Sequence, residues 1–428
     1  MRWVGPARGH EAADVIAMNT VALLVGLLVL SYLGSFWMTR RAAGGVGLSS
    51  GVEYAALGLV LGPQALDLVA AKDLTAFEPV VQVAIGWLAF GTGLDFGFAA
   101  ERRVSLGRLA QASLSAIVTG GAVAMVTWFV IGSLHIDVTK TERVLLAGGV
   151  AAACSQTTRH AVGWVAERFG ARGRLSDTLN DIAHSDVLFP LLAVALLFAL
   201  GGTRATLTKI SWIDGPLITI SLGIGLGAGA ALLLRSEMPV EDTWAMLFGP
   251  ALLVIGIAAR LGLSTLTASF FMGLALSMLS RHGPDLRAMV GPTERPVLLP
   301  ALLLAGARLD FRSTGSWPWI AAFAIAARIG ATILVGWAIA AGSRSARAAG
   351  PFVGLSLMSS GALSMCIGTA FALRFPGTIG DTVLVVTVLS ATVGEFVGPA
   401  RLRRSLHLAG EIEDTAVRAS PVSKEVGA

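Results

Sequence analysis

The stretch LNDIAHSDVLFPL, residues 179–191, decides how this chain folds and where its site is sought. It leads into an apolar run that continues through Leu200, and Asp186 lies inside that run instead of at its edge. An ionised carboxylate in hydrocarbon is costly, so an acid at such depth usually marks an ion or proton path. The alternative is an acid that only ends a helix. The rest of the chain discriminates between the two.

The composition is that of a membrane protein. Of the 428 residues, 54% are hydrophobic and 14% are charged, and the mean hydropathy is +0.74. A soluble chain carries roughly a quarter charged residues. The 51 glycines suit closely packed membrane helices, in which small residues let backbones approach. The apolar runs are continuous over about twenty residues, whereas a membrane β-barrel alternates apolar and polar residues. We therefore expect an all-α, multi-pass protein of the inner (plasma) membrane, embedded in a lipid bilayer.

Charge and cysteine usage exclude other classes. Arg and Lys on cytoplasmic loops account for the net charge of +5, so no nucleic-acid partner is implied. Cys154 and Cys366 both fall in apolar runs, which favours buried thiols over a disulfide or a metal site, and no cofactor is expected. The first apolar run is followed by Arg40 and Arg41 without a small-residue cleavage site, which predicts a retained span.

Apolar runs separated by charged, Gly or Pro clusters predict about thirteen transmembrane spans. They cover roughly 19–38, 52–70, 79–99, 107–132, 143–166, 178–200, 215–234, 244–260, 263–280, 296–307, 317–341, 350–373 and 379–399. An odd number places the termini on opposite sides, and the side that holds the C-terminus carries more Lys and Arg. The bias predicts an extracytoplasmic N-terminus (1–18), a transmembrane domain (19–400) and a cytoplasmic, disordered tail (401–428).

A short motif occurs twice and suggests an inverted repeat. Gly-x-x-Leu-Asp-Phe begins at Gly91 in the third span and at Gly306 in the tenth. A separation of seven spans reverses the direction through the membrane, as inverted repeats require, and transporters often place their sites between such repeats. The alternative is chance similarity between short apolar strings.

Polar clusters interrupt the two spans that this repeat matches, the fifth and the twelfth. The fifth holds Ser155, Gln156, Thr157 and Thr158, and the twelfth holds the run 358–364, with the sequence MSSGALS. Interruptions in corresponding helices indicate discontinuous helices whose free ends face a site at the membrane midplane. The alternative is a continuous helix in which each hydroxyl bonds to the preceding turn. Two clusters in matching positions favour broken helices.

Ionisable residues inside the spans supply candidate partners for Asp186. Arg328 lies near the middle of the eleventh span, where it needs an internal partner. Asp186 is the obvious acid, although helix carbonyls or Glu395 are alternatives. His184 is nearly opposite to Asp186 on a helix, so a helix-end or cytoplasm-facing histidine is favoured over a pH sensor.

Several motifs, in this order along the chain, resemble the monovalent cation:proton antiporter superfamily, in the branch of sodium/proton exchangers and potassium-efflux proteins. They are LGLVLGP (57–63), GTGLD (91–95), SD (185–186), AGARLD (305–310), RIG (328–330), GAL (361–363), GEFVGP (394–399) and LAGE (408–411). The chain departs from the family at Ser185, where an acid or amide often stands, and at 361–363, where some members have Gly-Glu-Phe. These departures leave the cation and the stoichiometry open.

The resemblance implies a homodimer of thirteen-helix subunits in which a six-helix core moves against a dimerisation domain. It implies that 19–400 is a cation/proton exchanger domain, with the essential carboxylate at Asp186 and the buried basic residue at Arg328. The paired broken helices then fall at Ser155–Thr158 and at Ser359, Ser360 and Gly361, in line with the polar clusters.

The expected function is exchange of Na⁺ or K⁺ for H⁺ by alternating access, without enzymatic activity. A hard monovalent cation prefers oxygen ligands, so it would bind Asp186 transiently beside hydroxyls. The candidate hydroxyls are those of Ser155, Thr157, Thr158 and Ser185. Burial raises the pKa of a carboxyl and a nearby Arg lowers it, and this balance decides where proton and cation compete. One acid favours one-for-one, electroneutral exchange.

Three alternatives remain open from the sequence. A sodium-coupled organic-anion symporter would share the repeats and crossed helices but would need a larger polar cavity. A transport-inactive sensor or scaffold is suggested by Ser185 in place of an acid. An intramembrane enzyme would need a paired-aspartate or His-rich signature, and the six histidines are scattered without spacing.

Overall fold

The computed structural model describes residues 26, 29, 51–66, 69, 71–101, 106–202, 211–234, 240–280, 283–310, 315–342 and 344–412. Within these ranges the regular structure is helical and there is no strand, which confirms the predicted all-α class. Seven of the described helices are long and apolar enough to cross a membrane, or eight if one bent pair is counted as a span. Thirteen spans therefore stays a prediction. The segment 1–18 and the tail beyond 412 lie outside the described residues.

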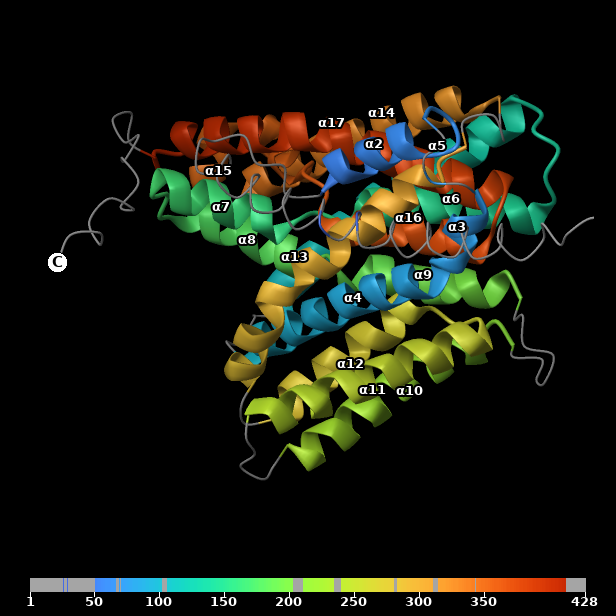
Figure 1. Ribbon diagram of the computed structural model, residues 1–428. Helices are drawn as coiled ribbons and strands as arrows, with labels where there is room; N and C mark the ends of the chain where they lie inside the picture. Colours follow the sequence, from blue (N-terminus) through green and yellow to red (C-terminus); the bar gives the residue numbers. More distant parts are fainter. Residues whose placement is uncertain are drawn as a thin grey trace, which may run out of the picture.

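The helices form two groups (Figure 1). The first, called the α4 bundle below, contains α4 (Glu78–Glu101), α10 (Asp214–Leu233), α11 (Val240–Leu261), α12 (Thr265–Leu279) and α13 (Gly283–Ala307). The short helix α3 (Ala71–Ala76) contacts α4, and α2 (Val52–Leu61) packs on α13 and also contacts α17 (Thr378–Leu408) of the second group. Helices α10, α11 and α12 lie on one side of α4 in Figure 1, and α13 runs across it. Phe90, Leu94 and Met272 belong to a core between α4, α10, α11, α12 and the first part of α13, whereas the buried side chains of α2 and of the second part of α13 join a larger core shared with the other group.

The second group, called the crossing bundle, contains α5 (Leu106–Ser133), α6 (Lys140–Ser155), α7 (Arg159–Phe169), α8 (Arg174–Ser185), α9 (Leu188–Leu200), α14 (Trp317–Gly342), α15 (Arg344–Ala349), the 3₁₀ helix η1 (Pro351–Leu357), α16 (Ala362–Arg374) and α17 (Thr378–Leu408). Here α5 packs on α6 and α14, and α17 packs on α16, η1 and α6. The two groups meet where α16 packs on α4 and α13, and where α9 packs on α10 and α12.

Local sequence sets several helix boundaries. Thr139 and Glu142 form a capping box at the start of α6, because the Thr139 hydroxyl accepts the Glu142 N–H at 3.3 Å and the Glu142 carboxylate accepts the Thr139 N–H at 2.8 Å. Helix α2 ends at Leu61, directly before Gly62 and Pro63, which lie inside the predicted second span. Proline cannot continue the ladder of hydrogen bonds.

The predicted pair of discontinuous helices is confirmed. Between α6 and α7 the backbone is extended at Gln156 (ψ 135°) and Thr158 (ψ 124°). Helices η1 and α16 are separated by residues 358–361, and their axes are bent by 61°. A further interruption was not predicted: α8 ends at Ser185 and α9 begins at Leu188. Pro190 has no N–H to donate to the Asp186 carbonyl four residues earlier, which explains this weak point.

The boundary of the predicted tail needs a correction. Residues 401–408 belong to α17, which runs to Leu408, and the chain is described through Ile412. Leu402 and Leu406 are fully buried one turn apart and pack with residues of α7 and α8. The arginines between them are good helix formers, so charge alone does not end the helix.

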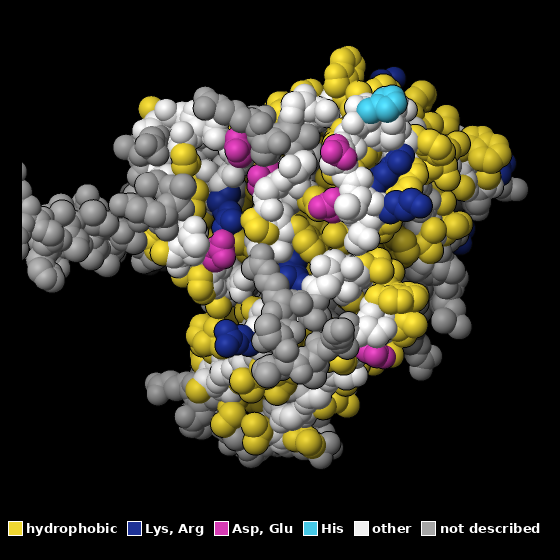
Figure 2. Space-filling view, turned by 90° about the vertical axis from the view of Figure 1, so that its right-hand side faces the viewer, with side chains coloured by type: hydrophobic (Ala, Val, Ile, Leu, Met, Phe, Trp, Pro, Cys, Tyr) yellow, Lys and Arg dark blue, Asp and Glu magenta, His cyan; other side chains and the backbone are white. Residues whose placement is uncertain are grey.

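Both ends of the molecule carry arginines that stack on aromatic rings. Arg143 lies 4.2 Å from the Trp128 ring at one end, and Arg403 lies 4.8 Å from the Phe169 ring at the other. Figure 2 shows the end opposite to the C-terminal end of α17, where acidic and basic side chains gather within a wider hydrophobic surface. Aromatic and basic residues typically mark the membrane–water interface, so the helices run between two polar ends.

Glycines allow the close contact of α4 and α12. A Cβ at Gly93 would lie 2.1 Å from the Phe270 carbonyl oxygen, and one at Gly273 would lie 2.1 Å from the Phe90 carbonyl oxygen. Each glycine therefore faces the backbone of the other helix. Small residues at such contacts are the main device of helix packing in lipid.

We predict that Gly273→Ala destabilises the protein by about 1–3 kcal/mol, the usual cost of forcing an extra group into a packed core. The measurement is the thermal unfolding temperature in detergent. Gly225→Ala in α10 is the matched control, because nothing lies within 4 Å of a Cβ there. An equal unfolding temperature for the two variants would contradict the close contact.

Candidate functional site

At their crossing, the two broken helices form hydrogen bonds with each other through backbone groups that the breaks leave free. The Thr158 N–H donates to the Ser359 carbonyl at 2.9 Å, and the Thr157 hydroxyl donates to the Leu357 carbonyl at 3.0 Å. The Gly361 N–H donates to Gln156 Oε1 at 3.3 Å. A helix break frees backbone groups that lipid cannot bind, so such a break persists only where protein supplies the partners.

Gly361 is required by the tight approach of the two breaks. A Cβ there would lie 2.9 Å from both Cβ and Oγ1 of Thr158. Nearby, the Ser364 hydroxyl donates to the Ala153 carbonyl at 2.6 Å, which ties the first turn of α16 to the last turn of α6. The crossing is therefore a rigid junction of four helix ends.

Asp186 is held at this junction by one oxygen. Its Oδ2 accepts the Thr157 N–H at 2.9 Å, and the residue is 1% exposed. Its Oδ1 is buried and has no hydrogen-bond partner in the described structure. A buried polar atom without a partner is rare in proteins and calls for a functional explanation. The carboxylate thus offers one free oxygen to a proton or a cation.

The hydroxyls predicted around Asp186 have different surroundings. Ser155, Thr157, Thr158 and Ser185 are all buried. The Ser155 hydroxyl donates to the Ala152 carbonyl at 3.1 Å, within its own helix, and the Thr157 hydroxyl reaches the second break. Ser185 adjoins Asp186 in sequence but takes part in none of the described hydrogen bonds of the crossing.

Arg328 is fully buried and bonds to the crossing, but not as an ion pair with Asp186. Its Nη1 donates to Ser360 Oγ at 2.6 Å and to Ser390 Oγ at 2.9 Å. Its Nη2 donates to the Gln156 carbonyl at 3.2 Å. Of the partners that the sequence suggested for Arg328, a helix carbonyl is therefore the one that it binds in the structure. The guanidinium lies against the C-terminal end of α6, where the helix dipole is negative.

Glu395 also lies near the crossing. The sequence places it near the end of the last span, yet α17 extends well beyond it and the residue is buried. The Ser359 hydroxyl donates to its Oε1 at 3.4 Å. Glu395 thus contacts the break between η1 and α16 instead of the membrane surface.

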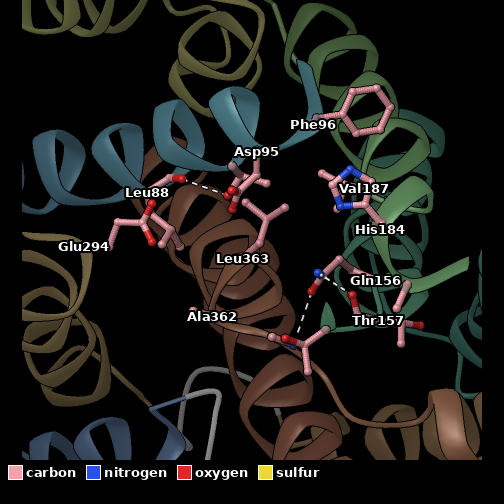
Figure 3. Close-up of a pocket in the computed structure, with 14 residues that line it drawn as sticks. Leu88, Asp95, Phe96, Gln156, Thr157, His184, Val187, Glu294, Ala362 and Leu363 are labelled. Carbon is pink, nitrogen blue, oxygen red and sulfur yellow. Dashed lines mark hydrogen bonds between the residues drawn. The ribbon is translucent and has the colours of Figure 1, made fainter. Parts of the chain in front are cut away.

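A pocket with about 70 Å³ of space for water-sized molecules leads toward the junction (Figure 3). Gln156, Thr157 and Gly361 line it from the crossing, and Asp95 and Glu294 line it from the α4 bundle. Thr157 thus borders the pocket and also binds Asp186 through its N–H. Thr157 therefore lies between this pocket and the Asp186 carboxylate.

Two acids and one arginine form a cluster at the pocket that the sequence did not single out as a site. Arg287 Nε donates to Asp95 Oδ1 at 2.6 Å, and Arg287 Nη1 donates to Glu294 Oε1 at 2.7 Å. Gly91 makes room for this cluster, since a Cβ there would lie 1.9 Å from Glu294 Oε1. Arg287 and Glu294 are seven residues apart, a spacing that places two side chains on the same face of a helix. Asp95 belongs to the repeated Gly-x-x-Leu-Asp-Phe motif, but nothing in the sequence placed it beside Arg287, which lies far away along the chain.

His184 lines the same pocket and stacks on Phe96, with ring centroids 5.6 Å apart and an interplanar angle of 12°. The stack joins α8 to α4, and Figure 3 shows the two rings on one side of the pocket. The histidine lies near the end of α8, as expected, but it faces the other bundle.

The fold matches that of known antiporters. The structure titled sodium proton antiporter MjNhaP1 from Methanocaldococcus jannaschii at pH 8 aligns with a TM-score of 0.67 and 15% identity, over 92% of this chain and 100% of that chain. A second structure, from a 3D EM map of the same antiporter, gives a TM-score of 0.61 and 16% identity over 92% and 99% of the two chains. No protein-family model and no curated protein matches the sequence. The likeness shows that this chain has the fold of these two antiporter structures, the fold that the sequence resemblance implied.

We predict that Arg328→Lys lowers the stability of the protein by about 1–3 kcal/mol, the worth of a hydrogen bond to a charged group. A single ammonium cannot reproduce the fork that reaches Ser360, Ser390 and the Gln156 carbonyl together. Thermal unfolding in detergent measures the effect. Arg260→Lys serves as the control, because Arg260 is exposed at the end of α11. An unchanged unfolding temperature for Arg328→Lys would refute the bridging role.

Proposed function

We propose that this chain is a secondary active transporter that exchanges a monovalent cation, Na⁺ or K⁺, for protons at Asp186. The observation that carries the proposal is the buried carboxylate with one oxygen fixed by Thr157 and the other unpartnered. A carboxylate in this state gains either from a proton or from a cation, and the two exclude each other. Mutual exclusion at one group is the chemical requirement of antiport.

The surroundings of Asp186 suit a hard, singly charged ion. Backbone carbonyls at the breaks and the Thr157 hydroxyl are oxygen ligands within the same junction. The C-terminal ends of α6 and η1 are negative, and the N-terminal ends of α7 and α16 are positive, so the four dipoles largely compensate. Arg328 adds a fixed positive charge whose Nη1 and Nη2 donate to two hydroxyls and a carbonyl. The charge of Asp186 is therefore the one that proton or cation neutralises.

The size of the pocket favours an ion over an organic anion. Its space of about 70 Å³ holds a few water molecules or a partly hydrated cation. Pockets for organic ligands are typically about 300–1,000 Å³. The acids Asp95 and Glu294 line this pocket, and Arg287, which binds both, offsets only one of their two negative charges, so the wall favours cations over anions. Both observations favour the exchanger over the sodium-coupled organic-anion symporter.

Access from two sides is supported by a second pocket at the other end of the same seam. It is lined by Gln82 and Ile85 of α4 and by Leu373 and Arg374 of α16, and has about 60 Å³ of space. Leu88 and Leu363, on the same two helices, line the first pocket. Rocking of the crossing bundle against α4 would open one pocket as it closes the other.

We predict that Asp186→Asn abolishes cation-driven proton exchange, because an amide neither releases a proton nor carries a negative charge. Everted or reconstituted vesicles with a pH-sensitive dye, challenged with Li⁺, Na⁺, K⁺ and Rb⁺ across pH, measure the rate and identify the cation. Asp214→Asn is the matched control, since Asp214 is an exposed acid at the start of α10. Undiminished exchange by Asp186→Asn sinks the proposal. Absence of exchange in the unmodified protein with every cation favours the sensor or scaffold.

We further predict electroneutral, one-for-one exchange. If Asp186 carries either one proton or one cation, the loaded carrier has the same net charge in both directions of the cycle. An imposed membrane potential of about 100 mV shifts a step that moves one charge by about 2.3 kcal/mol. The initial rate should therefore be equal with and without a valinomycin–potassium potential in sodium-driven assays. A severalfold change would show that a second charge moves with the cycle.

A further inference from the structure

The end of α17 is fixed in a defined geometry. Its last turn closes with Gly410 at φ +72°, where the Gly410 N–H donates to the His407 carbonyl at 2.9 Å and the Glu411 N–H donates to the Leu406 carbonyl at 3.0 Å. This pair of bonds is a Schellman motif, which needs a residue such as glycine in the left-handed conformation. Ile412 packs on the buried cluster formed by α7, α8 and α17. The side chain of Glu411 is thereby aimed in a set direction.

That direction leads to the start of α8. Glu411 Oε1 accepts the Leu175 N–H at 2.7 Å, and Glu411 Oε2 accepts the Ser176 N–H at 2.8 Å. Both N–H groups belong to the first turn of α8, where a helix has no internal acceptors. The preceding residue, Gly173, makes no side-chain cap. A carboxylate from a residue far along the chain thus replaces the local cap.

Gly173 makes room for this contact. A Cβ at Gly173 would lie 2.3 Å from the Glu411 Cδ and 2.4 Å from its Oε1. The φ of Gly173 is 167°, so space and not backbone strain is what requires glycine there. The Glu411 carboxylate can therefore reach the start of α8 only because residue 173 has no side chain.

The helix that Glu411 caps is the one that carries Asp186. Helix α8 has 12 residues and is about 18 Å long. Asp186 follows its last residue, and the Asp186 N–H donates to the Ile182 carbonyl at 3.1 Å. The other end of α8 meets Glu411. Helix α17 in turn holds Ser390, which binds Arg328 at the crossing.

We propose that Glu411 is a positioning residue that sets the place of Asp186 through α8. The inference rests on the proposed function for its effect on exchange, but not for its effect on structure. Because Glu411 fixes α8 to α17, and α17 is fixed to the crossing through Ser390, Asp186 and Arg328 are held in one frame. Loss of the carboxylate frees α8 to shift along its axis or fray, and the ligand oxygen moves with it.

The test compares Glu411→Ala and Gly173→Ala with Glu167→Ala, a matched control that removes an exposed acid from the neighbouring helix α7. Hydrogen exchange of the full chain in detergent reports both ends of α8. We expect exchange at Leu175 and Ser176 to rise about tenfold in the first two variants, as for other lost helix caps. Hydrogen exchange at the Asp186 amide should rise as well, and Glu167→Ala should show the same hydrogen exchange as the unmodified protein.

Transport gives the second readout. The cation concentration for half-maximal exchange should rise about tenfold in Glu411→Ala, the lower range for loss of a group that orients a ligand. Its pH profile should shift, while Glu411→Gln, which keeps one acceptor oxygen, should be intermediate. The proposal would be overturned if hydrogen exchange became faster only in the first turn of α8, while hydrogen exchange at the Asp186 amide and the cation concentration for half-maximal transport stayed unchanged. Glu411 would then act only as a helix cap. Equal behaviour of Glu411→Ala and Glu167→Ala would overturn it too.

The two readouts separate this inference from the proposed function. If the unmodified protein exchanges no cation, the function fails, but hydrogen exchange at Asp186 still decides whether Glu411 positions it. If exchange occurs and the Asp186 amide is insensitive to Glu411, the function stands and the positioning role fails.

Discussion

Everything at the centre of this protein depends on how two broken helices satisfy each other's backbone. Each break frees N–H and carbonyl groups that hydrocarbon cannot bind, and an unsatisfied group of this kind costs several kcal/mol. The bond from the Thr158 N–H to the Ser359 carbonyl at 2.9 Å spans the two breaks and is the geometric link between them. From that link follow the need for Gly361, the reach of Gln156 across the junction, and the orientation of the Thr157 N–H toward Asp186.

The separation of Arg328 from Asp186 has a chemical consequence. A guanidinium bound directly to the carboxylate would occupy its second oxygen and would hold the acid in its charged form. Here two hydroxyls and a carbonyl accept from Nη1 and Nη2 of Arg328, its Nε has no partner in the described structure, and Asp186 keeps one oxygen unpartnered. The arginine therefore binds the junction without occupying that oxygen. A buried positive charge nearby still offsets part of the negative charge of an ionised Asp186.

The sequence predicted the parts of this site that have a local signal. A charged or polar residue inside an apolar run is visible without a structure, so Asp186, Arg328 and the two polar clusters could be found. A helix carbonyl was among the partners considered for Arg328, but its hydroxyl partners could not be identified, because nothing in the sequence brings Ser360 and Ser390 together. Asp95 and Arg287 are 192 positions apart, and Glu411 lies 236 positions from Leu175, so no spacing rule connects them. The interruption at Asp186 could have been inferred from Pro190, because a proline has no N–H to donate to the carbonyl four residues before it.

The distribution of strong contacts indicates which parts move together. Arg328 joins α14 to both breaks and to α17, and Glu411 joins α17 to α8, so the crossing bundle is held by buried or charged hydrogen bonds. Within the α4 bundle, Arg287 and Arg308 form ion pairs, the latter with Glu78 at 2.6 Å. Between the bundles, the contact of α4 with α16 has a pocket at each end, and in the described structure a bond from the Thr267 hydroxyl to the Leu191 carbonyl at 2.8 Å joins α12 to α9. Deformation inside either bundle would break charge-assisted bonds, and such bonds are rarer in the described contacts along the seam. The described bonds therefore hold Asp186, Thr157 and Arg328 together within one bundle.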